Sequence, residues 1–153
     1  MSETPNHPLD SLADSSIPLV TRSLFAPRVI LLLAGTVASL VGLADLLVPV
    51  QIEAGVGVVV GTAPALLNEL RASGGGLLAV GCFILAGAFI AELTSAATLL
   101  AAIVYLGFAS GRLLSLAVDG LATPPLFFVN AIEIAIGAWS LIVFLRCRKH
   151  TGI

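Results

Sequence analysis

The chain has 153 residues, of which 58% are hydrophobic and only 10% are charged, and its formal net charge is -2. Soluble domains carry about 25% charged residues, and a domain of this length has too small an interior to bury so much apolar surface. The composition therefore excludes an ordinary soluble protein, and the acidic balance without a basic stripe excludes nucleic acid as a partner.

The first 28 residues form a polar segment that contains four prolines, five Ser and two Asp; the prolines are Pro5, Pro8, Pro18 and Pro27. Such a segment has too little apolar surface to offset the entropy of folding. We expect residues 1–28 to be a disordered cytoplasmic tail.

Four apolar segments follow, each about 20 residues long, which at 1.5 Å per residue spans roughly 30 Å of hydrocarbon. Helices are required because lipid offers no hydrogen-bond partners to open backbone groups. We therefore predict an all-α fold, an integral membrane four-helix bundle formed by residues 29–145. The predicted membrane-spanning segments are 29–48, 74–93, 97–118 and 125–145.

The connections between these segments differ in length. Thr94–Ala96 leaves room only for a tight turn, so the second and third helices should form an antiparallel hairpin in which Ser95 caps the third. Gly120 suits the end of the third helix, and Pro124 suits the start of the fourth. The connection over residues 49–73 is long and too apolar for a free loop, so we expect part of it at the membrane surface.

Basic residues gather at both ends of the predicted membrane domain. Four crossings return the chain to its starting side, and basic flanks face the cytoplasm, so we expect both termini there. Residues 146–153 would then be a basic cytoplasmic tail, and residues 49–73 would lie outside. The flanking basic residues are Arg22, Arg28, Arg146, Arg148 and Lys149.

Polar residues from all four predicted helices fall in one half of the membrane, next to residues 49–73. Arginine at the centre of a membrane helix costs about 2.5–3.5 kcal/mol, so it persists where a partner or water receives it. Arg112 and Glu133 lie at similar depth, and we expect them to pair. Tyr105, Arg112 and Asp119 are spaced by seven and share a helix face. The candidate ligand-binding or proton-binding residues are Asp45, Glu69, Arg71, Tyr105, Arg112, Asp119, Asn130 and Glu133.

Small residues recur on the first two predicted helices at helical spacing. In lipid, such stripes let two helices approach closely, so they mark faces that point into the bundle. The stripes are Gly35, Ala38 and Gly42 on the first helix, and Gly74, Gly81 and Ala88 on the second.

The polar residues in this half of the membrane include two arginines and four acids, so the charges do not balance and two interpretations remain. The arginines are Arg71 and Arg112, and the acids are Asp45, Glu69, Asp119 and Glu133. The layer either binds or moves a proton or small polar solute, or it only holds the helices of a non-catalytic membrane subunit or assembly factor together. We find no nucleophile arrangement, metal-ligand spacing or cofactor motif, so no catalytic residue, metal or cofactor is predicted and an enzyme is the least favoured class. Expected partners are membrane lipid and either a second copy or another membrane protein.

Three stretches carry a resemblance to a known family: "ELRASGG", "GRLLSLAVDG" and "EIAIG". Together they resemble the domain-of-unknown-function 4345 family over about residues 29–145. The resemblance implies a small four-helix, multi-pass membrane protein, and because the family is mostly bacterial, it implies a cell membrane such as the bacterial inner membrane. It implies no activity. It rests on Glu69, Arg71, Gly74, Gly75, Gly81, Gly111, Arg112, Asp119, Gly120, Glu133 and Gly137.

Overall fold

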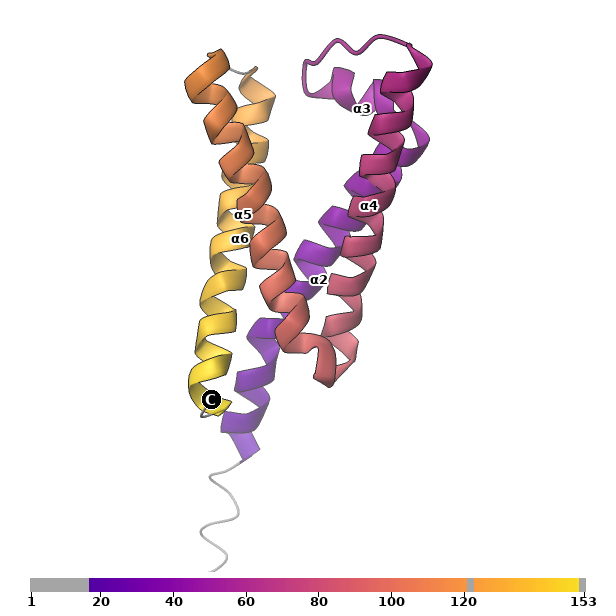
Figure 1. The fold of residues 1–153 in the computed structure, drawn as a ribbon. Coiled ribbons are helices and arrows are strands. Elements are labelled where there is room, and N and C mark those ends of the chain that lie inside the picture. The colour runs from indigo at the N-terminus through magenta and orange to yellow at the C-terminus, as the bar shows by residue number, and fades with distance from the viewer. Residues whose placement is uncertain (1–16, 121–122, 152–153) are drawn as a thin grey trace, which may run out of the picture.

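The computed structural model describes residues 17–120 and 123–151, and the regular structure of these residues is helical throughout (Figure 1). Four of the described helices are long and apolar enough to cross a membrane, which confirms the predicted all-α, four-helix membrane fold. The elements are α2 (Ile17–Leu47), α3 (Pro49–Gly55), α4 (Pro64–Phe89), the 3-10 turn η1 (Ala91–Leu93), α5 (Thr94–Asp119) and α6 (Pro124–Thr151).

Helix α2 starts earlier than the sequence predicts. It begins at Ile17, so residues 17–28 are helical and not the disordered tail that their composition indicates. Pro18 lies in the first turn, where backbone N–H groups have no hydrogen-bond partner within the helix, so proline is tolerated there. Pro27 lies inside the helix. The part suited to crossing a membrane begins at Phe25. The rest of the predicted tail, residues 1–16, lies outside the described residues.

Helix α4 also starts earlier, at Pro64 instead of residue 74. Proline at the first helical position has its φ angle already set for a helix, and the Ala, Leu and Glu that follow are strong helix formers. The connection predicted over residues 49–73 is therefore shorter, and Glu69 and Arg71 belong to a helix.

The turn between α4 and α5 occupies residues 90–93, just before the predicted position. Thr94, and not Ser95, supports it, because the Thr94 hydroxyl donates a hydrogen bond of 2.8 Å to the carbonyl of Gly87. Ser95 is exposed, and α5 has no side-chain cap. At the other end of α5, Gly120 has a φ of 97° and ends the helix as predicted.

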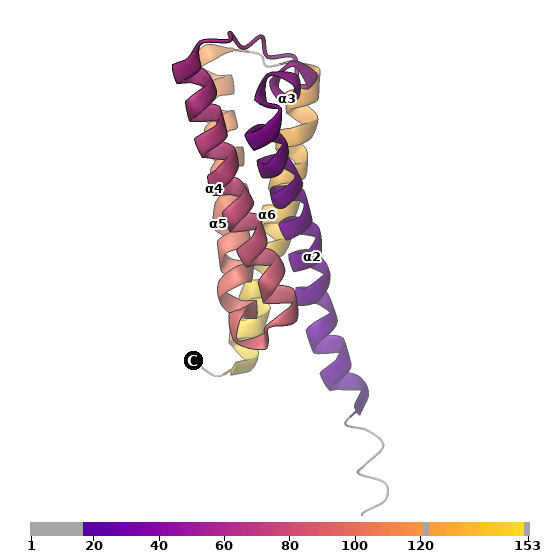
Figure 2. The same cartoon turned by 90° about the vertical axis from the view of Figure 1, so that its right-hand side faces the viewer.

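The helices form two close pairs, α2 with α4 and α5 with α6, which meet at one end and diverge toward the other (Figure 1). We call the end with the start of α2 and the end of α6 the terminal end, and the opposite end the connection end (Figure 2). Both ends of the described chain thus lie together, as four crossings require. That the terminal end faces the cytoplasm stays a prediction from the basic residues.

Glycines bring α2 and α4 into backbone contact along their length. A Cβ atom built on Gly74 would lie 2.8 Å from the carbonyl oxygen of Gly42, and one on Gly81 would lie 2.5 Å from the backbone nitrogen of Ser39. Real Cβ atoms do not approach other atoms so closely, so the close approach depends on glycine. The two small-residue stripes therefore face each other, and their predicted inward orientation is confirmed.

The apolar core lies mainly in the terminal half of the bundle, where the two pairs meet. Many of its members are alanines, which let the helices approach closely. The two helix pairs are therefore packed together in the terminal half and separate in the connection half. The buried core residues are Ile30, Leu31, Ala34, Ala38, Ile84, Ala88, Ala97, Ala101, Tyr105, Ile136 and Val143.

At the connection end, a hydrogen bond links the two pairs across the top of the bundle. The Thr123 hydroxyl, just before α6, donates a bond of 2.6 Å to the carbonyl of Val56, just after α3. The same threonine side chain lies against Gly57, whose φ is 82°. The connection that follows α2 is thus tied to the opposite helix pair.

Candidate functional site

An ion pair joins α5 to α6 in the connection half. The Nε of Arg112 donates a hydrogen bond of 3.0 Å to Oε2 of Glu133, and it is the sole ion pair found among the described side chains. The Glu133 side chain is 12% exposed and that of Arg112 is 37% exposed, so the carboxylate is the more deeply buried partner. The predicted pairing is confirmed. Because the contact uses Nε, the terminal NH2 groups of the guanidinium are not bound to Glu133.

A cleft of about 240 Å³ lies between the two helix pairs, next to this ion pair. All four long helices contribute to it. Most of its lining is aliphatic, together with the ring of Phe108. Its polar lining residues are Asp45 from α2, Ser73 from α4, Tyr105 and Arg112 from α5, and Glu133 from α6.

Asp45 is the unmatched charge of the cleft. Its side chain is half-buried, and its Oδ1 atom is buried without a hydrogen-bond partner in the structure. Buried polar atoms are almost always hydrogen-bonded, so an unpartnered one needs an explanation such as water or a ligand. The α4 backbone at Gly74 lies close to the Cβ atom of Asp45. Because Asp45 lines the cleft, a partner for its carboxylate would reach it from there.

Tyr105 has a structural role in the same cleft. Its side chain is buried, and its hydroxyl donates a hydrogen bond of 2.7 Å to the carbonyl of Ala34, across from α5 to α2. Tyr105 lies seven residues nearer the terminal end than Arg112. It therefore forms the base of the cleft, and its single O–H donor is already in use.

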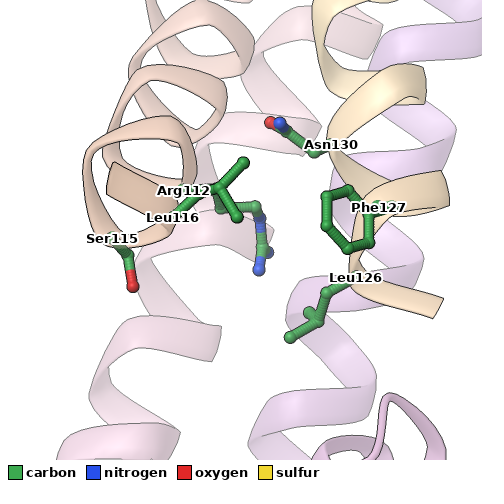
Figure 3. A pocket seen from close by; sticks show the side chains of 6 residues that line it. All are labelled: Arg112, Ser115, Leu116, Leu126, Phe127 and Asn130. Atoms are coloured by element: carbon green, nitrogen blue, oxygen red, sulfur yellow. The ribbon is translucent and has the colours of Figure 1, made fainter. Parts of the chain in front are cut away.

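A second, smaller pocket of about 100 Å³ lies between α5 and α6 on the connection side of the ion pair. Figure 3 shows the Arg112 side chain reaching from α5 toward Leu126 and Phe127 of α6. Asn130 also lines this pocket, and its Oδ1 atom is buried without a hydrogen-bond partner. Arg112 borders both the pocket and the cleft, so it links the two spaces.

Three of the predicted site residues lie outside these spaces. Asp119 is exposed at the end of α5, where its carboxylate accepts a hydrogen bond of 2.8 Å from Ser115. Glu69 and Arg71 are exposed on the first turns of α4. These three residues lie at the connection end, where the pairs have already diverged. The sequence predicted them on the basis of shared depth, but none of the three lines the cleft or the smaller pocket.

The sequence reasoning missed Ser73 and Phe108 as lining residues. Ser73 precedes Leu77 by four positions, and both line the cleft, as residues on one helix face do. The signal was hidden because the predicted second helix began after Ser73. Phe108 precedes Arg112 by four positions, so its place beside the charge could have been inferred from helical spacing.

The chemistry available in the cleft is that of two carboxylates, one guanidinium and hydroxyl groups. Within residues 17–120 and 123–151, no group of three or more His, Cys, Asp or Glu residues is arranged to hold a metal ion. The arrangement suits reversible binding through charge and hydrogen bonds in an apolar surrounding.

The chain matches the model of a known family. Residues 26–144 match the family described as "Domain of unknown function (DUF4345)", which covers most of the chain and agrees with the resemblance of the three sequence stretches. No curated protein and no solved structure matches the chain. This four-helix membrane protein belongs to the domain-of-unknown-function 4345 family.

Proposed function

We propose that this protein is a membrane-embedded binding or transport module whose cleft takes a proton or a small polar solute. The observation that carries the proposal is the cleft between the helix pairs, which gathers Asp45, Arg112 and Glu133 from three helices. Charged side chains within a membrane are expensive, and they commonly mark the path of an ion or solute.

The balance of charges supports binding over a purely structural role. Arg112 and Glu133 compensate each other through their hydrogen bond. Asp45 has no such partner, although its Oδ1 atom is buried. A cluster that only held helices together would gain nothing from an uncompensated acid, because desolvating a charge without a partner is unfavourable.

The orientation expected from the basic residues places this cleft in the outer half of the membrane. With both termini in the cytoplasm, the connection end faces outward. In a bacterial inner membrane, the cleft would then exchange its ligand with the periplasmic side.

Water access to the cleft tests the proposal. In a background carrying Cys82→Ala and Cys147→Ala, we would compare Val41→Cys, which lines the cleft, with Leu40→Cys, which is 61% exposed on the outer surface of α2. A membrane-impermeant, cationic methanethiosulfonate reagent reacts with the thiolate, which requires water.

The neighbouring positions have similar depth, so the comparison isolates the cleft. We expect Val41→Cys in proteoliposomes to react much faster than Leu40→Cys, which would face lipid. Equally slow reaction at both positions would show a dry cleft and would contradict the proposal.

An assembly role is the second candidate, and one observation favours it. Gly107 and Gly111 on α5 have open space where a Cβ would be, unlike the tightly contacted glycines of α2 and α4. They line an open groove on the bundle surface beside Phe108. Glycines four apart on a membrane helix allow another helix to approach closely.

Gly107→Leu tests this second candidate, because it puts a large side chain into the groove at a position where a Cβ atom has nothing within 4 Å. If α5 is an assembly surface, the variant should lose an oligomer or a co-purifying protein, as measured by light scattering of the detergent-solubilised complex. The same mass for the variant and the unmodified protein would argue against assembly through this face.

A further inference from the structure

We infer that the cleft binds an organic cation, a protonated amine with a small apolar body, whose ammonium group contacts Asp45. The inference rests on the proposed function, since it names the class of solute that the same cleft would take. Three features carry it: the charges that line the cleft, the hydrogen-bonding state of Asp45, and the apolar character and size of the cleft.

The charges facing the cleft come from three of the four helix walls. Arg112 and Glu133 cancel on the side of α5 and α6, and the Tyr105 hydroxyl is taken by a backbone carbonyl. Ser73 is the polar lining residue on α4 and is neutral. Asp45 on α2 therefore gives the lining a net formal charge of one negative unit, which favours a cation over an anion.

The carboxylate of Asp45 also lacks a hydrogen-bond donor. An ionised carboxylate only accepts hydrogen bonds, and its Oδ1 atom receives none in the structure. A protonated amine supplies N–H donors and a positive charge at once, which makes a charge-assisted hydrogen bond. A hard metal cation prefers a cage of about six oxygen ligands, and within the described residues no group of three or more His, Cys, Asp or Glu is arranged to hold a metal ion.

The remaining lining suits an apolar body. Eight of the thirteen residues that line the cleft are Val, Ala, Leu, Ile or Phe. Phe108 adds an aromatic ring, and aromatic faces attract cations. Pockets for drug-sized ligands run from about 300 to 1,000 Å³, so a cleft of about 240 Å³ takes a smaller molecule. Alkylamines and arylalkylamines of modest size meet all three conditions.

Protection of the Val41→Cys variant from the thiol reagent tests this ligand class. The probes are hexylammonium chloride, hexanol and sodium hexanoate, which share an apolar chain and differ in the charge of the head group. We expect hexylammonium to protect at a concentration about tenfold lower than hexanol does, and hexanoate to protect least. Asp45→Asn should abolish the difference between amine and alcohol, whereas Glu69→Gln, which changes an exposed acid of α4, should preserve it.

Two results would overturn the inference while leaving the proposed function intact. Equal protection by hexanol and hexylammonium would show that charge is not recognised, and stronger protection by hexanoate would show that Arg112 selects an anion. Failure of Val41→Cys to react with the reagent at all would instead refute the proposed function. If Asp45→Asn lowered the yield of folded protein, the comparison of the three probes on protein with Asp45 intact would still decide.

Discussion

The two helix pairs are held together by different means in the connection half. Helices α2 and α4 meet through Gly42 and Gly74, with backbone against backbone. Helices α5 and α6 are joined there by the side chains of Arg112 and Glu133. The first contact leaves no room for a side chain between the helices. In the second, the long Arg112 side chain lies between α5 and α6 and borders both the pocket and the cleft.

We call the α2–α4 contact the rigid wall of the cleft and the α5–α6 contact its adaptable wall. Backbone contacts between glycines have one arrangement, because no rotamer can change the distance between the helices. An ion pair can lengthen, exchange partners or admit water. If the cleft binds a ligand as proposed, we expect its lining to change on the α5–α6 side, with α2 presenting Asp45 from a fixed position.

The largest expected effect comes from breaking the rigid wall. In Gly42→Ala, the added Cβ would lie 2.7 Å from the carbonyl oxygen of Gly74 and would meet the backbone of Leu78, so the helices must separate. Overpacking against backbone should lower the free energy of unfolding by about 3 kcal/mol. Unfolding in mixed micelles with increasing SDS measures it.

Gly76→Ala is the matched control for this prediction, because nothing lies within 4 Å of the position where its Cβ would be. Alanine is the better helix former, so stability should stay the same or rise by up to about 1 kcal/mol. Equal losses in Gly42→Ala and Gly76→Ala would contradict the close glycine contact between α2 and α4.

Breaking the adaptable wall should have a smaller effect. Arg112→Ala removes the partner of Glu133, whose side chain is 12% exposed. Loss of one partner of a fully buried pair costs about 3–5 kcal/mol, and partial exposure of Arg112 reduces this to about 2 kcal/mol. The double variant Arg112→Ala with Glu133→Ala should recover part of the loss, as thermal unfolding in detergent would measure.

Arg71→Ala controls for the loss of a positive charge, since Arg71 is exposed on α4 and makes no ion pair in the structure. Its stability should change by less than about 0.5 kcal/mol. Strictly additive losses in the two single variants and the double variant would show that Arg112 and Glu133 do not couple.

Tyr105→Phe tests the base of the cleft, where the two pairs meet. The change removes the hydrogen bond from the Tyr105 hydroxyl to the carbonyl of Ala34 and keeps the ring. The expected loss of stability is about 1 kcal/mol, the typical net value of one hydrogen bond. Because the hydroxyl is not assigned to the ligand, protection by hexylammonium should persist. Loss of that protection in a folded Tyr105→Phe protein would give the hydroxyl a binding role.

The smallest change in stability is expected for the link across the connection end. Thr123→Val removes the 2.6 Å hydrogen bond to the carbonyl of Val56. This bond is only partly buried, so the loss of stability should be below about 1 kcal/mol. Reaction of Val41→Cys with the thiol reagent should nevertheless become faster, because the two pairs lose the hydrogen bond that joins them at the connection end.

Thr94→Val provides the comparison at the terminal end, where the hydroxyl supports the turn between α4 and α5. It should leave the reaction rate of Val41→Cys unchanged, since the pairs are closed there by apolar packing. Similar rates in both threonine variants would indicate that the connection end does not limit access to the cleft.

The sequence by itself determined the class of fold and one contact of the site. Apolar segments of membrane length can only be helices, because lipid leaves backbone groups unsatisfied, and this constraint needs no tertiary information. Shared depth and the cost of a lone arginine predicted the Arg112–Glu133 pair, which the structure confirms. The inward faces of the glycine stripes followed from spacing alone.

Tertiary structure decided which polar residues share a cavity. The early start of α4 placed Ser73 on the cleft and Glu69 on an exposed face, and hydropathy does not detect a helix that extends beyond the apolar run. Because the two helix pairs diverge toward the connection end, Asp45 lines the cleft and Asp119 does not. Depth and helical face are properties of single helices, whereas the distance between helices depends on which residues meet at their contacts. Here alanines and aliphatic side chains pack the two pairs together in the terminal half, and the cleft separates the pairs in the connection half.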